Sequence, residues 1–426
     1  MSSVAALGRL TGAIFTLIRQ DALLPRELDG IYPPALRILS RAQRLLGGPK
    51  SRQGRPGERL ARALEGMGPV AIKLGQLLST RADIFGITFA EDLSRLKDRL
   101  PAFSTEVARK AVEQSLGRPL SDLFFNFGEP VAAASLAQAH EALLLDGRRV
   151  AVKVLRPGVE RRVAEDGEVL ALAGQIVEFW APSLRRLEPR KLTETVIRAT
   201  ELELDLRLEA AGADELREVT ARDGYMSVPK VVWDGVGKRV LTLEWAKGTP
   251  LSDPAALTLP GIDRKAMADN LIRAFLVQAL DHGVFHADLH EGNLFVSAPD
   301  QVVAVDFGIV GRLGPMERRY LAEILYGFIT RNYLRVSEVH FEAGYVPRNH
   351  DPAVFAQAIR SIGEPIMDRP ASQISMARLL TQLFEITAQF DMQTQPHLLL
   401  LQKTMVMVEG LATALDPTIN MWDVSA

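Results

Sequence analysis

The sequence predicts an α+β fold of two lobes, the first rich in strands and the second mostly helical. Short strand-like runs begin at Phe125 and end at Trp245. After Gly248-Thr249-Pro250 the apolar residues recur mostly at helical spacing. The residues before the first lobe also look largely helical. We therefore divide the 426 residues into a helical extension at 1–110, a small lobe at 111–247 and a large helical lobe at 248–426.

The composition is that of an ordered globular protein, with 47% hydrophobic and 24% charged residues. The net charge of −2 gives no general attraction to nucleic acid, which we do not expect as a partner. The absence of cysteine excludes disulfides and thiolate metal sites, and it fits a reducing cytosol. No uncharged apolar run approaches the roughly 18 residues that predict a membrane span.

The first 48 residues look helical, with an interruption at Pro33-Pro34. Between Arg9 and Arg19, apolar residues recur at helical spacing: Leu10, Ile14, Leu17 and Ile18. This pattern predicts an amphipathic helix. Such a helix either lies at a membrane surface or packs on the large lobe as an ordinary helix, and the sequence leaves both open. A basic linker runs from Gly47 to Gly57.

A further helix is predicted to open at Gly68-Pro69, with proline at its first position. One face of this helix is apolar and carries Val70, Leu74, Leu77 and Leu78. Another face carries polar residues at steps of three or four: Lys73, Gln76, Thr80 and Asp83. Spacing alone favours a solvated face for this polar stripe.

Turn residues mark the strands of the small lobe. Residues 127–130, Phe-Gly-Glu-Pro, are typical of a turn, and residues 131–142 of two strands around an alanine-rich loop. Asp146-Gly147 indicates a hairpin, and the strand at 149–155 follows it. We expect helices at 161–218. A second hairpin is predicted around Asp234-Gly235, with strands at 228–233 and 239–245.

Two motifs in the second lobe carry chemistry, His286-Ala287-Asp288-Leu289-His290-Glu291-Gly292-Asn293 and Val305-Asp306-Phe307-Gly308. Asp288 and Asn293 are five residues apart (293 − 288), and Asn293 and Asp306 are thirteen apart (306 − 293). Phosphoryl transfer needs a carboxylate at the attacking hydroxyl and two oxygen ligands for Mg²⁺ near the ATP phosphates. We therefore predict that Asp288 orients the nucleophile and that Asn293 and Asp306 bind Mg²⁺. Lys153, in Val150-Ala151-Val152-Lys153, would hold the phosphates.

Together these pieces predict a two-lobed protein-kinase-like fold. Short strands at 294–296 and 302–305 carry the predicted metal ligands, and Leu243-Glu244-Trp245 connects the lobes. Glu244 is a further candidate for binding the nucleotide. We expect His286 to brace the catalytic loop, residues 286–293, through backbone hydrogen bonds rather than to take part in the chemistry.

Several features of ordinary protein kinases are absent from the sequence. Residues 132–139 are alanine-rich where a glycine-rich phosphate loop belongs, position 287 is alanine in place of the usual arginine, and no Ala-Pro-Glu follows Asp306. The best candidate for the helix glutamate that pairs with Lys153 is Glu209, which lies 56 residues further on (209 − 153). This distance leaves room for one or two extra helices inside the small lobe.

The chain resembles the UbiB family of atypical protein-kinase-like proteins from about residue 30 to the end. Lys73-Leu74-Gly75-Gln76 resembles the family's Lys-x-Gly-Gln motif, Ala132-Ala133-Ala134-Ser135 its alanine-rich loop, and Glu203-Leu204-Asp205 its Glu-x-Asp motif. Asp288, Asn293 and Asp306 match its active-site trio. The sequence departs from the family at Ala137, where Gly is usual, at Leu289 and Glu291, where Pro is usual, and at Ala139, where a branched apolar residue is usual.

The resemblance implies that Lys73 and Gln76 lie over the nucleotide site. It also implies that four residues of the alanine-rich loop contact ATP or ADP: Ala132, Ala133, Ala134 and Ser135. We assign Glu209 to Lys153, and Glu203 with Asp205 to Lys73. Glu201, Asp205 and Glu209 recur at intervals of four, so we expect them on one stripe of a single helix, where they would repel unless cations face them.

The same resemblance implies an ATP- and Mg²⁺-binding ATPase that supports ubiquinone (coenzyme Q) biosynthesis at the membrane. The implied partners are polyprenyl quinone precursors, ubiquinone-biosynthesis proteins and a membrane surface, and a homodimer is a further expectation. The implied location is the bacterial cytoplasm, peripheral to the inner membrane. Bacterial members usually continue beyond Asp416-Pro417 into membrane helices, so we expect either a soluble variant or a truncated form.

Two other functions fit part of the pattern. One is a small-molecule phosphotransferase of the aminoglycoside- or choline-kinase type, whose catalytic loop has the same His-x-Asp-Leu-His-x-Gly-Asn pattern. The other is a non-catalytic nucleotide-binding scaffold. The Lys-x-Gly-Gln segment and the alanine-rich loop argue against the first, and the complete set of Lys153, Asp288, Asn293 and Asp306 argues against the second.

Overall fold

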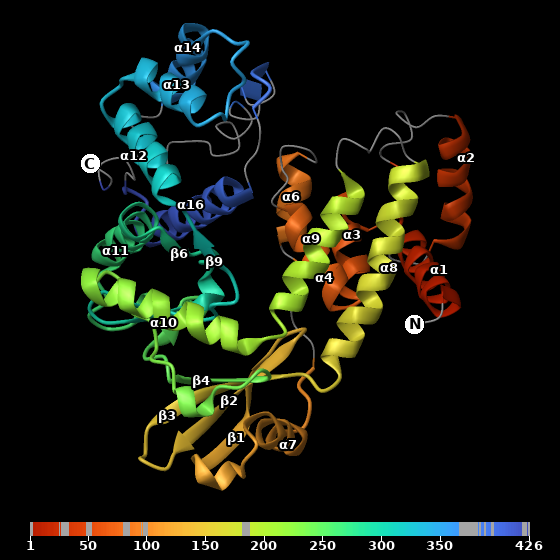
Figure 1. Ribbon diagram of the computed structural model, residues 1–426, viewed down its shortest axis with the longest axis vertical. Helices are drawn as coiled ribbons and strands as arrows, with labels where there is room; N and C mark the ends of the chain where they lie inside the picture. Colours follow the sequence, from red (N-terminus) through yellow and green to blue (C-terminus); the bar gives the residue numbers. More distant parts are fainter. Residues whose placement is uncertain are drawn as a thin grey trace. The chain divides into compact units, whose positions relative to one another are not determined.

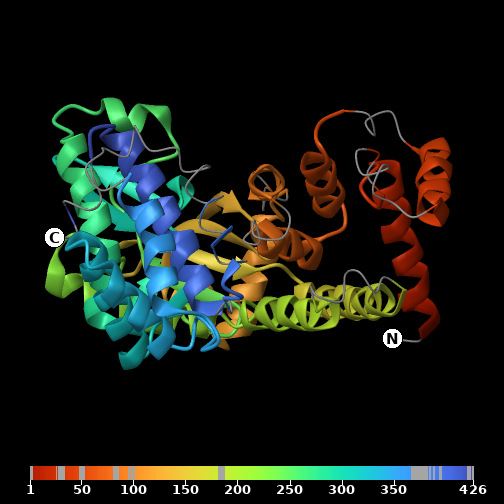
Figure 2. The same cartoon turned by 90° about the horizontal axis from the view of Figure 1, so that it is seen from above.

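The computed structural model describes residues 3–24, 26, 34–47, 53–79, 86–94, 96, 101–180, 188–365, 382, 385–386, 389–392, 396–419 and 424 (Figures 1 and 2). The chain forms two compact units. Unit 1 comprises Met1–Leu208 with Asp234–Thr242, and unit 2 comprises Glu209–Trp233 with Leu243–Ala426. Unit 1 combines helices with a four-stranded sheet, and unit 2 is mostly helical with two small sheets. The predicted α+β, two-lobed kinase-like fold is therefore confirmed, while the division into three domains stays a prediction.

Unit 1 begins with helices, as the sequence predicts. They are α1 (Ser3–Arg19), α2 (Pro34–Gln43), the 3₁₀ turn η2 (Arg44–Leu46), α3 (Pro56–Glu65), α4 (Pro69–Ser79), α6 (Ile87–Ser94) and α7 (Thr105–Leu116). Leu10 of α1 is buried, and Arg9 pairs with Glu165 and Asp166 of α8. The first helix thus packs on α8 within unit 1, whereas we expected an ordinary N-terminal helix to pack on the large lobe.

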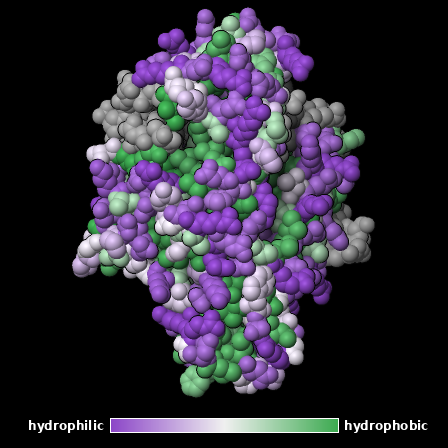
Figure 3. Space-filling model, turned by 60° about the vertical axis from the view of Figure 1, so that its left-hand side comes forward, coloured by the Kyte–Doolittle hydropathy of each residue, from purple (hydrophilic) through white to green (hydrophobic). Residues whose placement is uncertain are grey.

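The sheet of unit 1 has the strand order β1-β2-β3-β4. Its strands are β1 (Phe124–Ala133), β2 (Ala137–Leu144), β3 (Arg149–Leu155) and β4 (Val240–Glu244), and the 3₁₀ turn η3 (Leu120–Asp122) precedes them. The hairpin at Asp146-Gly147 is confirmed, with Gly147 at φ +84°. The lower end of Figure 3, which this sheet occupies, shows hydrophobic side chains exposed among hydrophilic ones, and Phe125 and Val131 of β1 are among the exposed residues.

One turn prediction in this sheet is wrong, and a second predicted hairpin forms only in part. Residues 127–130 do not reverse the chain, because they lie inside β1, whose pairing with β2 is irregular there. Pro130 is tolerated because β1 is an edge strand, where a missing N–H need not break the ladder. In the second predicted hairpin only the later strand forms as β4. The earlier segment, 228–233, makes a single bridge from Val231 to Leu243, and the 3₁₀ turn η5 (Trp233–Gly235) follows it.

Two helices form the insert after β3. They are α8 (Val159–Trp180) and α9 (Pro189–Leu202), which lie side by side in Figures 1 and 2. At Gly174 an added Cβ would lie 3.0 Å from Thr193 Cγ2, so a glycine in α8 lets α9 approach closely. The predicted insert of one or two helices is confirmed.

Unit 2 contains the two motifs at 286–293 and 305–308 and consists of helices and short strands. Its helices are α10 (Leu206–Asp223, which begins in unit 1), α11 (Arg264–Val277), α12 (Pro315–Ile329), α13 (Tyr333–Glu342), α14 (Pro352–Gly363) and α16 (Pro396–Leu415). Shorter helical turns are η6 (Pro254–Thr258), η7 (Gln278–His282) and η8 (Glu291–Asn293). One sheet has the order β5-β7-β8, from β5 (Thr249–Pro250), β7 (Leu294–Ser297) and β8 (Gln301–Ala304). The other pairs β6 (Val284–His286) with β9 (Val310–Arg312).

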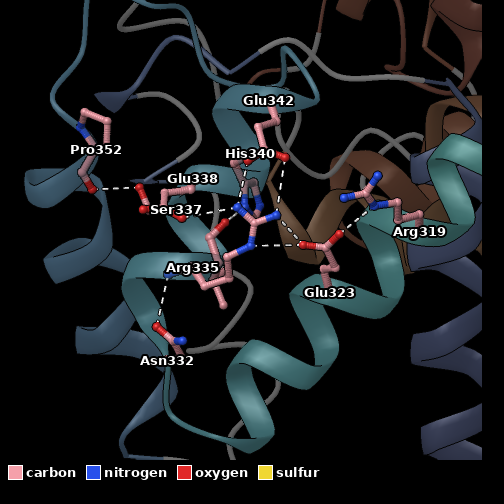
Figure 4. Close-up of polar contacts among 10 residues, drawn as sticks. Arg319, Glu323, Asn332, Arg335, Ser337, Glu338, His340, Glu342 and Pro352 are labelled. Atoms are coloured by element: carbon pink, nitrogen blue, oxygen red, sulfur yellow. Dashed lines mark hydrogen bonds and ion pairs between the residues drawn. The ribbon is translucent and has the colours of Figure 1, made fainter.

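A charged network joins α12 to α13 (Figure 4). The Arg335 guanidinium binds Glu323 of α12 through Nε at 3.0 Å, and Glu342 through Nη1 at 2.7 Å. These hydrogen bonds raise the pKa of Arg335. Ser337 donates a hydrogen bond of 2.6 Å to the carbonyl oxygen of Pro352, which ties α13 to the start of α14. This network lies beside the hydrophobic core of Val336, Val346, Phe355 and their neighbours.

None of the helices that the structure describes combines the length and apolar character needed to cross a membrane.

Candidate active site

The catalytic loop of unit 2 is held by His286, at the end of β6. The backbone N–H of Asp288 donates to His286 Nδ1 at 3.2 Å, so Nε2 carries the proton and donates to the carbonyl oxygen of Val305, also at 3.2 Å. The imidazole is buried, and its burial lowers the pKa of His286, which favours the neutral form this arrangement requires. The bracing role predicted for His286 is confirmed.

Asn293 ties the same loop together from its other end. Its side-chain amide donates to the carbonyl oxygen of Asp288 at 3.0 Å, and its backbone carbonyl accepts from Val305 N–H at 2.9 Å. Because the amide nitrogen is used in this way, Oδ1 is the group of Asn293 that remains for a cation. Asn293 is buried at the foot of β7, so its orientation is fixed by the loop.

Asp306 follows β8 in an unusual backbone conformation. Its φ is +62°, in the left-handed region that non-glycine residues adopt only where the surroundings require it, often at functional sites. Phe307 is buried, with its ring 5.4 Å from that of His286. The Asp-Phe-Gly turn therefore packs on the residue that braces the catalytic loop, and the two predicted metal-binding segments form one structure.

The donor set of Asn293 and Asp306 fits Mg²⁺. An amide oxygen and a carboxylate are hard ligands, and Mg²⁺ is usually bound through one or two carboxylates together with substrate phosphates. Among the described residues no group of three or more His, Asp or Glu side chains could enclose a metal by itself. Two such ligands suit a cation whose remaining positions are filled by nucleotide phosphates and water.

Asp288 has a partner that the sequence did not indicate. Lys403 Nζ, on α16, lies 3.0 Å from Asp288 Oδ1, although the two residues are 115 positions apart. Asp288 Oδ2 lies 3.8 Å from His290 Nε2, too far for a hydrogen bond. His290 Nδ1 itself accepts from Gly292 N–H at 3.0 Å, so His290 mainly caps the turn η8.

Glu209 lies in the first turn of the part of α10 that belongs to unit 2, and it is buried. Three residues further on, a Cβ added to Gly212 would lie 3.0 Å from Val310 Cγ2, so this face of α10 runs close to β9. An ion pair between Glu215 and Arg312 anchors the same helix to β9. Glu244, at the end of β4, is half-buried, and its N–H donates to the carbonyl oxygen of Lys230 at 2.9 Å.

In unit 1, Lys153 lies on the face of the sheet that the alanines share. Ala132 is opposite Ala139, and Ala139 is opposite Lys153, so these three side chains point the same way. Val152 and Val154 point to the opposite face and are fully buried. Small side chains therefore leave room beside Lys153. Since Lys153 belongs to unit 1 and Glu209 to unit 2, their pairing stays a prediction.

The alanine-rich loop is held by residues outside it. Arg156 Nε donates to the carbonyl oxygen of Ala134 at 2.9 Å, and its Nη1 donates to that of Pro101 at 2.9 Å. Gln138 bonds both backbone groups of Phe103, at 2.8 and 3.0 Å. Ser135, at the tip, is buried. The loop and the segment 101–103, which leads in from the N-terminal helices, are thus fastened to each other.

The Lys-x-Gly-Gln motif lies on α4. Lys73 Nζ is 2.8 Å from Glu203 Oε2, as the assignment of Glu203 to Lys73 predicts. A Cβ at Gly75 would have to displace the methyl groups of Leu64 and Leu96, so this glycine lets α4 pack on the core of Leu64, Leu93 and Leu96. Gln76 is half-buried, and its carbonyl oxygen accepts from Ser79 Oγ at 2.6 Å. Thr80 and Asp83 of the polar stripe lie outside the described residues.

The predicted single helical stripe of Glu201, Asp205 and Glu209 is wrong. The helix α9 ends at Leu202 and α10 begins at Leu206, so a turn separates the three acids. Asp205 forms this turn, because its Oδ1 accepts from Arg207 N–H at 3.1 Å and Arg207 Nη2 binds Oδ2 at 2.6 Å. The Arg207 side chain lowers the pKa of Asp205. Arg207 is therefore a cation for Asp205 that our assignment missed.

The two-lobed α+β fold and the braced Asp288, Asn293 and Asp306 define a kinase-like protein. The family model of the ABC1 atypical kinase-like domain matches residues 95–340, and that of the UbiB helical domain matches residues 359–420. The chain belongs to the UbiB family of atypical kinase-like proteins, as its motifs indicated.

Curated relatives and a solved structure agree. A probable protein kinase UbiB of Marinobacter nauticus is 39% identical over 96% of this chain and 75% of its own length. The corresponding protein of Cellvibrio japonicus is 39% identical over 96% of this chain and 74% of its length. The Rv3197–erythromycin structure from Mycobacterium tuberculosis shares the fold, with a TM-score of 0.58 and 23% identity over 90% of this chain and 94% of that one.

Proposed function

We propose that this protein binds Mg²⁺-ATP and cleaves its γ-phosphoryl group as an atypical kinase-like ATPase in ubiquinone biosynthesis. The observation that carries the proposal is the shared bracing of the catalytic loop and the Asp-Phe-Gly turn by His286 and Asn293. Such bracing supports the proposed placement of a carboxylate for the nucleophile beside two oxygen ligands for a cation. Membership of the UbiB family, which is linked to ubiquinone biosynthesis, supports the pathway.

In the proposed reaction Lys153 holds the α- and β-phosphates, and Asn293 Oδ1 and Asp306 bind Mg²⁺. The bound cation would neutralise charge on the β- and γ-phosphate oxygens. Asp288 orients a hydroxyl or water and accepts its proton as the new oxygen–phosphorus bond forms and ADP leaves. Lys73, Gln76 and the loop residues Ala132 to Ser135 lie around the nucleotide in this proposal. Glu203 holds the Lys-x-Gly-Gln segment through Lys73, Glu209 pairs with Lys153, and Glu244 contacts the nucleotide.

Phosphate release by the purified protein tests this function. Wild type should release phosphate from Mg²⁺-ATP, whereas Asp288→Asn should lose turnover by about 10²–10⁴-fold, the usual contribution of a positioned acid–base group. It should still bind Mg²⁺-ADP. Equal turnover of the two proteins would contradict the role of Asp288, and absence of turnover in both would favour the nucleotide-binding scaffold. ADP formation that is matched by phosphorylation of an added amino alcohol or aminoglycoside, and not by release of free phosphate, would favour the small-molecule phosphotransferase.

The proposal also includes a location, at the cytoplasmic surface of the bacterial inner membrane, with polyprenyl quinone precursors, ubiquinone-biosynthesis proteins and a second copy of the chain as partners. The helix α1 is the leading contact. Leu10 is buried against the protein, but Phe15 on the same helix is 49% exposed, and the helix ends in a cation, Arg19. Anionic liposomes should co-sediment with the full chain and stimulate hydrolysis, and deletion of residues 1–25 should weaken both effects. Equal binding by the truncated protein would place the membrane contact elsewhere.

A further inference from the structure

The ion pair between Lys403 and Asp288 joins two segments that the family models treat separately. Asp288 lies within the kinase-like match, at 95–340, and Lys403 lies within the helical-domain match, at 359–420. The nitrogen-to-oxygen distance is 3.0 Å, and the two side chains are 29% and 30% exposed. A partly exposed pair adds little to stability by itself. The pair matters for another reason, because Lys403 binds the carboxylate that we propose to be catalytic.

The helix that carries Lys403 is firmly seated in unit 2. One face of α16 is buried, and its residues are Leu401, Thr404, Val408 and Ala412. This helix packs on α11 and on β9, beside β6 in Figure 1. Near its end, Arg264 Nη2 donates to the carbonyl oxygen of Ala414 at 2.8 Å. Since β9 pairs with β6, and β6 leads directly into the catalytic loop, α16 supports the strands that carry Asp288. The backbone at Lys403 is therefore held in place by the packing of α16.

The two carboxylate oxygens of Asp288 have different surroundings. Lys403 binds Oδ1, while Oδ2 makes no hydrogen bond to His290, whose Nε2 is 3.8 Å away. A carboxylate with one oxygen held by a cation cannot rotate freely, and its second oxygen is left to accept a hydrogen bond from a nucleophile. A charge-assisted hydrogen bond of this kind is roughly twice as strong as a neutral one, which suits it to holding a single rotamer.

We infer that Lys403 is a positioning residue for Asp288, and that through it the helical segment at 359–420 completes the catalytic site of the kinase-like domain. The inference rests on the proposed function, because it gives Lys403 a role only if Asp288 acts on the nucleophile. Lys403 orients the carboxylate so that Oδ2 faces the attacking oxygen. It does not contact the nucleotide in this role, so it should affect turnover and leave nucleotide binding alone.

The test measures kcat and KM for Mg²⁺-ATP, and the thermal shift with Mg²⁺-ADP, on full-length variants. Lys403→Met should lower kcat by about 10- to 100-fold, the order expected when a reacting group is misplaced by about 1 Å, with KM and the thermal shift unchanged. Lys403→Arg keeps a cation and should restore most of kcat. Gln402→Met changes the neighbouring position of the same helix and should behave as wild type.

A double mutant separates a role through Asp288 from an independent one. In the Asp288→Asn background, adding Lys403→Met should cause no further loss of turnover, because residues that act as a unit are not additive. Wild-type kcat in Lys403→Met would overturn the inference, as would a rise in kcat, which would make the pair an inhibitory latch. A rise in KM as large as the expected fall in kcat would overturn it too, since it would mean that Lys403 contacts the nucleotide. If Asp288→Asn itself hydrolyses ATP like wild type, the proposed function fails instead.

Discussion

The catalytic loop in unit 2 and the alanine-rich loop in unit 1 are held in place in different ways. In the catalytic loop, His286 and Asn293 each bond the backbone of Asp288 and of Val305, within 20 residues of chain (305 − 286 + 1). The tip of the alanine-rich loop is instead held by Arg156, which also binds Pro101, while Gln138 of β2 binds Phe103. The first loop is thus a local structure. The second depends on the segment that leads in from the N-terminal helices, so a change in that segment can reach the loop.

The largest expected effect is at the metal site of the locally built loop. Asp306→Asn should abolish Mg²⁺-dependent nucleotide binding while leaving the fold intact. It removes the charged ligand, and asparagine tolerates the left-handed backbone at this position. A ligand at 100 times its Kd stabilises a protein by about 2.7 kcal/mol, so thermal melts with Mg²⁺-ATP provide the measurement. Glu291→Gln, which removes one exposed charge in the same loop, is the control. A full Mg²⁺-ATP shift in Asp306→Asn would refute the metal assignment.

The next largest effect tests whether His286 holds the catalytic loop in place through its bonds to residues close in the chain. His286→Leu removes the partners of the Asp288 N–H and the Val305 carbonyl, and each buried group left without a partner costs about 1–3 kcal/mol. We expect a clear fall in melting temperature and loss of turnover. A variant as stable and as active as wild type would show that the bracing bonds are dispensable.

The same variant should change how stability depends on pH. Burial lowers the pKa of His286, so below pH about 6.5 the unfolded chain takes up a proton that the folded chain does not. The stabilisation is present above that pH and is lost as the pH falls through it. His140 and His340 are shifted in the same direction and remain in the variant. Denaturant unfolding between pH 7.5 and 5 should therefore show a shallower loss of stability in His286→Leu than in wild type, and parallel curves would contradict this.

The difference between the loops also explains what could be predicted from sequence. Spacing located Asp288, Asn293 and Asp306 because their geometry depends on neighbours close in the chain. Lys403 gave no signal, since one lysine in an apolar helix pattern can face any direction, and its partner is 115 residues away. Arg156 directly follows the predicted strand that carries Lys153. Its partners, the carbonyl oxygens of Ala134 and Pro101, are 22 and 55 residues away, and spacing does not indicate them.

Wrong predictions arose where a local pattern had two outcomes. The spacing of Glu201, Asp205 and Glu209 fits a helix, but an aspartate can also accept from the backbone N–H two residues on and start a new helix, as Asp205 does with Arg207. Gly128 and Pro130 indicate a turn, yet both are tolerated in an irregular edge strand. In each case the tertiary position of the segment, which spacing does not encode, decided the outcome.

Arg156→Met tests the dependence of the alanine-rich loop on its distant anchors. The substitution removes charge-assisted bonds to the Ala134 and Pro101 carbonyls, each typically about 1.5–3 kcal/mol, and should weaken nucleotide binding roughly tenfold by loosening the loop. Isothermal titration with Mg²⁺-ADP measures it. Arg149→Met removes an exposed arginine, paired with Glu141 on the same sheet, and is the matched control. Equal affinities of the two variants would mean that the anchors do not set the loop.

The smallest effect is expected inside the alanine-rich loop itself. Ala134 is held by backbone bonds, since its N–H donates to the Ala137 carbonyl at 2.8 Å and its own carbonyl accepts from Arg156, and neither bond needs a side chain. Ala133→Gly or Ala134→Gly therefore removes only a methyl group and some stiffness, a cost of about 0.5–1 kcal/mol, and allows the backbone closer to a phosphate. We expect the ADP and ATP affinities to change by about two- to fivefold, and by different factors for the two nucleotides.

In the Arg156→Met background the same glycine should have a larger effect, because the two changes act on one loop. Unchanged ADP and ATP affinities in both glycine variants would mean that the loop does not touch the nucleotide. Changes as large as that of Arg156→Met would mean that the methyl groups, and not the anchors, hold it.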